Sequence, residues 1–228
     1  MNETQQAAFD AALDALPLVA ILRGVRPEEV EEVFDALVAA GFRMIEIPLN
    51  SPMPWKSIEK VAARCPEHVL VGAGTVLTAE DTAQLARLEA PLMVTPNSDP
   101  EVIRAGIEQG LAPLVGCMTP SEALSAARAG AKALKLFPAG RLGTGYFKDI
   151  SAILPPELPV FAVGGIDKSN MSDWHGMGIR GFGFGSNLYR PGRSAAEVGE
   201  IARELVAEWR RLEELHTMTE LFEHEGDQ

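Results

Sequence analysis

The stretch GLAPLVGCMTPSEALSAARAGAKALKLF, residues 110–137, contains one complete unit of the pattern from which we predict the fold. It contains two short apolar runs separated by a segment of helical composition. Thr119 and Glu122 form the T-x-x-E pattern of a capping box, which opens a helix over residues 121–129. Gly130 then ends that helix, because glycine adopts the left-handed conformation at a helix C-terminus without steric cost. The stretch therefore predicts a strand, a helix and a second strand, the repeating unit of a parallel α/β fold.

The same alternation continues along the whole chain. An open doubly wound sheet usually has five or six strands and a glycine-rich first turn, but the first apolar run here ends in ILRGVRP, which contains no G-x-G-x-x-G. A closed parallel barrel has eight strands that alternate with helices, and this sequence contains eight such apolar runs. The eight expected strands are Leu18–Arg23, Arg43–Leu49, Val69–Thr75, Leu92–Thr95, Ala112–Cys117, Ala133–Phe137, Val160–Val163 and Ile179–Phe184.

We therefore predict a single (β/α)8 TIM-barrel domain over residues 1–228, with no internal linker. Residues 1–15 have an acidic, helical composition and predict an extra N-terminal helix. The last long helix is expected over about Ala195–Leu215, because Val198, Ala202 and Leu205 follow one apolar stripe. Residues 212–228 are expected to form an acidic C-terminal extension, of which 216–228 show little periodicity.

The composition limits the classes of function. Of the 228 residues, 46% are hydrophobic and 23% are charged, which is typical of a globular protein. The net charge of −12 argues against nucleic acid or an anionic membrane as a partner. The negative net charge is compatible with an anionic small-molecule ligand, since backbone amides can bind phosphate on acidic proteins as well. Two cysteines and four scattered histidines predict neither a disulfide framework nor a metal site. With no apolar membrane span and no leader-like start, we expect a cytoplasmic protein.

Lys135 is the most informative polar residue, because it lies between Leu134 and Leu136 inside an apolar strand. A charged lysine is seldom fully buried without a partner or a function. Burial disfavours the ammonium form, and the neutral amine is a nucleophile towards ketones and aldehydes. The strand context supports two interpretations equally, a Schiff-base nucleophile and an ion-paired core lysine.

Glu46 lies in a second apolar strand, RMIEIPLNSP, close to its C-terminal end. TIM barrels carry their chemistry at this end of the strands. An apolar environment raises the pKa of a carboxyl group, which suits proton transfer near neutral pH. The alternative is a structural partner for Lys135 or Arg23. A lysine and a glutamate at one rim form the minimal pair for imine chemistry, because one forms the adduct and the other moves protons.

Two glycine-containing loops predict a phosphate site. Gly164 and Gly165 follow the seventh strand, and Gly185 and Ser186 follow the eighth. Barrels often bind phosphate through backbone N–H groups of these two loops. Either pair alone usually marks a turn, but their occurrence at both loops favours phosphate binding, with the hydroxyl of Ser186 as a further donor.

Four more residues complete the predicted rim. Arg23 ends the first strand, and Thr75 ends the third. The hydroxyl of Thr75 either donates to a substrate carboxylate or returns to nearby backbone, and the sequence supports both equally. Pro96 and Phe137 are expected as apolar walls beside Lys135 that keep water from the imine.

Seven motifs, in this order and spacing, closely resemble the class I 2-keto-3-deoxy-6-phosphosugar-acid aldolases over about residues 16–211. They are LPLVAILRGV, FRMIEIPLNSP, VGAGTVLT, VTPN, ALKLFPAG, VFAVGGI and GFGSNLYRPG. The segment EIPLNSP is similar to the galactonate-type branch of that family, whereas gluconate-type members carry a pattern like E-x-T-L-R-T.

The resemblance implies a metal-free enzyme without cofactor, usually homotrimeric, that cleaves a phosphorylated 2-keto-3-deoxy sugar acid to pyruvate and glyceraldehyde 3-phosphate. Lys135 matches the Schiff-base lysine and Glu46 the acid/base residue. The positions that match substrate-binding residues are Arg23, Thr75, Gly164, Gly165, Gly185 and Ser186. Three alternatives stay open: the gluconate epimer as substrate, a barrel phosphosugar isomerase or epimerase with Glu46 as base, and a phosphosugar-binding sensor.

Overall fold

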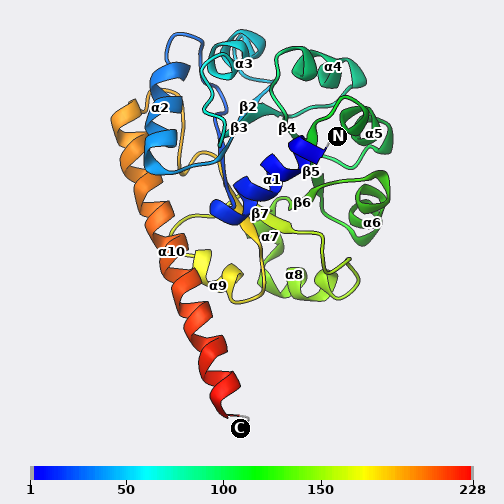
Figure 1. Cartoon of the computed structure of the whole chain (residues 1–228), viewed down its shortest axis with the longest axis vertical. Helices are drawn as coiled ribbons and strands as arrows, with labels where there is room; N and C mark the ends of the chain where they lie inside the picture. Colours follow the sequence, from blue (N-terminus) through cyan, green and yellow to red (C-terminus); the bar gives the residue numbers. More distant parts are fainter. Residues whose placement is uncertain (1–2, 227–228) are drawn as a thin grey trace.

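The computed structural model describes residues 3–226 of the chain, and the side chains of residues 6–218. The predicted closed barrel is confirmed, because eight parallel strands pair in sequence order and the last pairs with the first (Figure 1). The strands are β1 Leu18–Ile21, β2 Met44–Pro48, β3 Leu70–Gly74, β4 Leu92–Val94, β5 Ala112–Cys117, β6 Ala133–Leu136, β7 Val160–Val163 and β8 Gly181–Phe184. Each lies within its predicted run, so the polar residues that end several runs lie just beyond the strands.

The helices surround the barrel. They are α1 Glu3–Ala15, α2 Val30–Ala40, α3 Pro54–Ala62, α4 Ala79–Arg87, α5 Pro100–Glu108, α6 Pro120–Ala129, α7 Ala139–Leu142, α8 Thr144–Ser151, α9 Met171–His175 and α10 Ala195–Gly226. None of the helices in the described part of the chain is long and apolar enough to cross a membrane.

The C-terminal extension corrects one prediction. Helix α10 continues to Gly226 and projects away from the barrel (Figure 1), so the expected end near Leu215 was wrong. The segment after Leu215 is rich in glutamate and contains no proline, and its intrinsic propensity favours a helix even without an apolar stripe. The predicted N-terminal helix is confirmed over residues 3–15, while residues 1–2 and 227–228 lie outside the described part.

Local signals place the helix ends where the sequence indicates. The Thr119 hydroxyl accepts from the backbone N–H of Glu122, and the Glu122 carboxylate accepts from the N–H of Thr119, as expected for a capping box. Gly130 ends α6 with a φ of 102°, and Gly41 ends α2 with a φ of 109°. Only glycine adopts this conformation without strain. Each glycine lets the chain enter the next strand within a few residues.

The interior of the barrel is filled in layers by alternate residues of each strand. The layer near the strand starts includes Met44, Leu70, Leu92 and Phe161, all fully or almost fully buried. Phe9 of α1 belongs to the same cluster, and Figure 1 shows α1 lying across this end of the barrel. Burial of one such aromatic side chain stabilises a fold by roughly 2 kcal/mol. Helix α1 therefore closes the barrel at the N-terminal ends of its strands.

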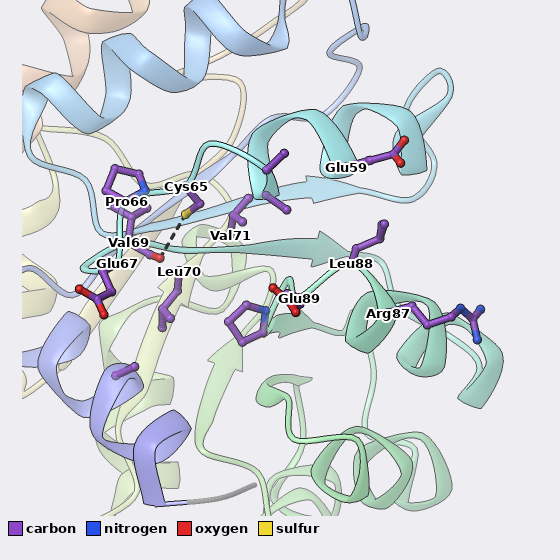
Figure 2. Close-up of a pocket in the computed structure, with 14 residues that line it drawn as sticks. Glu59, Cys65, Pro66, Glu67, Val69, Leu70, Val71, Arg87, Leu88 and Glu89 are labelled. Atoms are coloured by element: carbon purple, nitrogen blue, oxygen red, sulfur yellow. Dashed lines mark hydrogen bonds between the residues drawn. The ribbon is translucent and has the colours of Figure 1, made fainter.

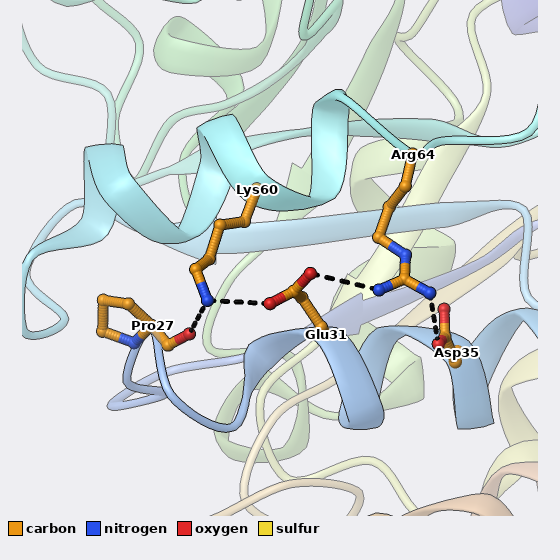
Figure 3. A network of polar contacts seen from close by, with 5 residues as sticks. All are labelled: Pro27, Glu31, Asp35, Lys60 and Arg64. Carbon is orange, nitrogen blue, oxygen red and sulfur yellow. Dashed lines mark hydrogen bonds and ion pairs between the residues drawn. The ribbon is translucent and has the colours of Figure 1, made fainter.

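An ion-pair network on the outer surface joins α3 to α2 (Figure 3). Lys60 of α3 donates to the carbonyl of Pro27 at 2.8 Å and pairs with Glu31 of α2 at 2.7 Å. Arg64, two residues beyond the end of α3, pairs with Glu31 at 3.1 Å and with Asp35 at 2.7 Å. The hydrogen bond from Lys60 is the largest cause of the lowered pKa of Glu31. All four charged side chains are partly exposed, so the network aligns the two helices more than it stabilises the fold.

Candidate active site

Among the described residues, one acidic and one basic side chain are buried in the strands of the barrel, Glu46 and Lys135. The strand register places Glu46 of β2 opposite Gly72 and Lys135 of β6 opposite Gly116. Their exposed fractions are only 1% and 6%. The fold therefore brings the predicted nucleophile and the predicted acid/base residue to the same end of one closed barrel.

A glycine on the neighbouring strand makes room for the glutamate. A Cβ atom at Gly74 of β3 would lie 1.9 Å from Oε2 of Glu46 and 2.3 Å from its Cδ. Any larger residue would occupy the space that the carboxyl group fills. Gly74 is therefore required by packing against Glu46 and not by an unusual backbone angle.

The carboxyl group of Glu46 is held without a counter-ion in contact. Its Oε2 atom is buried and has no hydrogen-bond partner, and no ion pair joins it to Lys135 or Arg23 among the described residues. Burial raises the pKa of Glu46 to about 7, against the opposing effect of the positive charges on Lys135 and Arg23. A carboxyl group with this pKa both accepts and returns a proton near neutral pH. The alternative, a structural partner for Lys135 or Arg23, stays open, because both charges act on the pKa of Glu46.

The pKa of Lys135 is shifted in the opposite direction to that of Glu46. Burial lowers the pKa of its ammonium group, and the charge of Arg23 lowers it further, while Glu46 raises it. Its Nζ atom lies 5.3 Å from the centre of the Phe137 ring. Because the neutral amine is the nucleophilic form, burial favours attack on a carbonyl carbon.

A cavity of about 440 Å³ opens above Lys135 at the C-terminal ends of the strands. It brings together most of the predicted site residues, namely Arg23, Thr75, Pro96, Lys135, Phe137, Gly164 and Gly185. Three residues missed by the sequence analysis also line it, Ile21, Asn50 and Val163. Asn50 was the recognisable one, since it is a polar residue in the loop directly after the strand that carries Glu46.

Thr75 follows β3 in a conformation that is unusual for threonine. Its φ of 58° lies in the left-handed region, where a β-branched residue is strained. The alternative of a hydroxyl returned to backbone is not supported, because no such hydrogen bond of Thr75 is found among the described residues. The strained backbone directs a polar side chain into the cavity instead.

The predicted phosphate loops are only partly at the cavity surface. Gly164 and Gly185 line it, whereas Gly165 and Ser186 lie beside it and are exposed. The carbonyl of Gly164 accepts from the N–H of Gly140 at 2.8 Å, which fixes the loop after β7. Within the described residues, the N–H groups of Gly165, Gly185 and Ser186 donate to no other backbone group. These amides are therefore free to bind an anion.

A larger hollow of about 550 Å³ lies at the opposite end of the barrel, beside α1 (Figure 2). Its one potential nucleophile is Cys65, whose thiol donates to the carbonyl of Val69 at 3.2 Å. Burial raises the pKa of this thiol to about 11, so the reactive thiolate is disfavoured. The charged residues around the hollow, such as Glu59, Glu67 and Arg87, extend along its edge. The smaller cavity that contains Lys135 is therefore the candidate active site.

Known proteins with similar sequences identify the family of this chain. The family model described as KDPG and KHG aldolase matches residues 9–201, most of the chain. The chain belongs to the KDPG and KHG aldolase family. Its relatives are aldolases, so this protein is a lyase.

The aldolase is 50% identical over 186 residues to the probable 2-dehydro-3-deoxy-6-phosphogalactonate aldolase of Rhizobium meliloti strain 1021, which covers 82% of this chain and 88% of that relative. It is 44% identical over 195 residues to the 2-dehydro-3-deoxy-6-phosphogalactonate aldolase of Escherichia coli strain K12, covering 86% and 95% of the two chains. Among solved structures, a cube-shaped porous protein cage designed by fusing symmetric oligomeric domains is similar to it, with a TM-score of 0.90 and 41% identity. That match covers 92% of this chain and 77% of the cage chain.

Proposed function

We propose that this aldolase cleaves 2-dehydro-3-deoxy-6-phosphogalactonate to pyruvate and D-glyceraldehyde 3-phosphate through a Schiff base on Lys135. One observation carries the proposal, the placement in one barrel interior of a buried lysine with a lowered pKa and a buried glutamate with a pKa of about 7. The lowered pKa favours the nucleophilic amine form of Lys135, and Glu46 is a proton acceptor with a pKa near neutral pH.

The reaction begins when Nζ of Lys135 attacks the C2 keto carbon. The carbinolamine loses water and becomes a protonated imine. Glu46, through a water molecule, takes the proton of the C4 hydroxyl, and the C3–C4 bond breaks. The electron pair of that bond moves to the imine, which becomes an enamine, while C4 leaves as the aldehyde carbon of glyceraldehyde 3-phosphate. Protonation at C3 and hydrolysis of the imine release pyruvate and restore Lys135.

Hydrogen-bond donors for the carboxylate and the phosphate of the substrate lie around the cavity. Arg23 and Thr75 are available at its mouth, and Thr75 is assigned to the pyruvate carboxylate. The free N–H groups of Gly165, Gly185 and Ser186 are assigned to the phosphate. Pro96 and Phe137 form the apolar side of the cavity next to Lys135.

The assignment of the galactonate epimer rests on two observations. The segment EIPLNSP, residues 46–52, has the galactonate-type pattern. The two relatives at 50% and 44% identity are both described as acting on this epimer. Steady-state measurement of pyruvate release from both C4 epimers tests it, and we expect a higher kcat/KM for the galactonate compound. A higher kcat/KM for the gluconate compound would contradict the assignment.

Covalent trapping tests the mechanism. Incubation with pyruvate and sodium borohydride should add one reduced pyruvate to the mass of the protein. Lys135→Ala should form no adduct and should lose at least about 10³-fold in kcat, because each tenfold corresponds to about 1.4 kcal/mol of lost barrier reduction. Lys132→Ala, three residues earlier on the same stretch, is the control and should form the adduct normally. An adduct that survives Lys135→Ala, or turnover without pyruvate release, would refute the Schiff-base assignment.

We further propose that the aldolase folds as one domain and assembles as a homotrimer in the cytoplasm. The similarity to a cage built from symmetric oligomeric domains supports an oligomer. So do Met53, Leu77 and Met118, which are about half exposed on three loops at the cavity end of the barrel. Light scattering coupled to size exclusion should give about three times the chain mass of 24.5 kDa.

A further inference from the structure

Arg23 and Asn50 form a side-chain pair at the mouth of the cavity. Arg23 follows β1, Asn50 follows the adjacent strand β2, and both line the cavity. Nη1 of Arg23 donates to Oδ1 of Asn50 at 2.7 Å. Within the described part of the chain, Arg23 has no carboxylate partner, so this hydrogen bond is what directs its guanidinium group.

The backbone of the two loops is held by a separate contact. Oγ of Ser51 accepts from the backbone N–H of Gly24 at 3.0 Å, and Ser51 is 7% exposed. The N–H of Ser51 donates in turn to the carbonyl of Pro48 at 2.9 Å. Because these contacts fix the loops without Asn50, the amide of Asn50 determines the direction of the Arg23 side chain and not the position of the loops.

The chemistry of the pair explains why the partner is an amide. A guanidinium group only donates hydrogen bonds, so the amide oxygen of Asn50 faces it and the amide NH₂ group lies on the other branch. A neutral acceptor leaves the positive charge of Arg23 available to an anionic ligand, whereas a carboxylate would neutralise that charge. A long arginine side chain that is already oriented also loses less conformational freedom when a ligand binds.

The guanidinium group so oriented lies within electrostatic reach of both reacting residues. Its charge lowers the pKa of Glu46 and the pKa of Lys135. A rotation of Arg23 away from the cavity would therefore change ligand affinity and the electrostatic environment of both groups together.

We propose that Asn50 is a positioning residue, whose amide oxygen holds the guanidinium group of Arg23 over the cavity so that it binds an anionic group of the substrate. This inference rests on the proposed function only in taking the ligand to be an anionic sugar acid.

A double-mutant cycle on ligand binding tests the inference without any turnover. The probe is 3-phosphoglycerate, which carries a carboxylate and a phosphate, and its Kd is measured by isothermal titration calorimetry. Asn50→Leu, which removes the acceptor at similar volume, should weaken binding about tenfold. Arg23→Met should weaken binding at least as much. In the double variant, Kd should stay within about twofold of Arg23→Met alone, because Asn50 acts through Arg23.

Asn97→Leu is the matched control, since Asn97 is an exposed asparagine at the same end of the barrel but outside the cavity lining. It should leave Kd unchanged. In the cleavage assay, Asn50→Leu should raise KM about tenfold and move the pH profile of kcat to higher pH, because the charge of Arg23 lowers the pKa of both Glu46 and Lys135. Asn50→Ala replaces Asn50→Leu if melting curves show that the leucine variant does not fold.

Three results would overturn the inference: no effect of the Asn50 variant on Kd, an equal additional loss in the Arg23→Met background, or no binding of the probe to the wild-type chain. Failure of the proposed function has a different signature, which is the absence of a pyruvate adduct and of pyruvate release in the wild type. The binding cycle still decides the role of Asn50 in that case.

Discussion

Replacement of Glu46 by glutamine separates the cost of burying this carboxyl group from its use in catalysis. Glutamine has nearly the same shape but does not ionise. In the folded chain the pKa of Glu46 rises from 4.5 to about 7, mainly through burial. Below pH 4.5 the carboxyl is protonated in both the folded and the unfolded chain, so it contributes no penalty. As the pH rises from 4.5 to 7, the unfolded chain releases this proton and the folded chain keeps it, so the free energy of unfolding falls.

The size of the effect follows from the same two values. A rise of the pKa from 4.5 to about 7 corresponds to about 3 kcal/mol of lost stability above pH 7, at about 1.4 kcal/mol per tenfold change in protonation. Urea denaturation of the wild type and of Glu46→Gln at pH 4 and pH 8 measures it. We expect the free energy of unfolding of the variant, relative to that of the wild type, to be about 3 kcal/mol higher at pH 8 than at pH 4. The effects of all other groups cancel in this comparison.

Activity should change in the opposite sense. Glu46→Gln should still be trapped by pyruvate and borohydride, since Lys135 is intact, but should lose about 10²–10⁴-fold in kcat, the usual contribution of general acid–base catalysis. The reasoning would be refuted by a stability difference between the two proteins that does not change with pH. Full activity in a stabilised variant would refute the catalytic role alone.

Two further substitutions test the packing and the local signals. Gly74→Ala should lower kcat at least about tenfold, because the new Cβ would lie 1.9 Å from Oε2 of Glu46, whereas Gly145→Ala, with no atom within 4 Å of the added Cβ, is the neutral control. Equal activity of the two variants would count against the packing argument. Thr119→Ala should lower the stability by about 1 kcal/mol in urea denaturation through loss of the α6 cap to Glu122, with kcat unchanged. An unchanged denaturation midpoint would show that the cap adds nothing.

The fold could be predicted from the sequence because each unit carries its own start and stop signals. Gly130 and the capping box at Thr119 are local features, and local chemistry alone places the ends of α6 and the start of β6. The end of α10 could not be found in this way. A helix whose residues favour the helical conformation can continue without an apolar stripe or a tertiary contact. The apolar periodicity of α10 ends before the helix does, so it predicts too early an end.

The site could be predicted where its residues lie within the apolar strands of the alternating pattern. Lys135 and Glu46 stand out because charged residues in apolar strands are rare. Asn50 gives a weaker signal, that of a polar residue in the loop after the Glu46 strand, and its contact with Arg23, 27 positions earlier, is not visible in the sequence. The packing of Glu46 against Gly74 could not be predicted either, because a glycine in a strand does not show which neighbouring side chain fills the space next to it.

Helix α1 closes the barrel at the end opposite the cavity. Phe9 and Ala12 pack into the apolar cluster at the far end, and the cavity that contains Lys135 lies at the other end, beside Arg23. In the proposed reaction the pyruvate half is bonded to Lys135 on the floor, and the aldehyde lies between it and the mouth. The aldehyde must therefore leave first, and in the reverse direction pyruvate must enter first. The enzyme should follow a compulsory order, with pyruvate always the last product out.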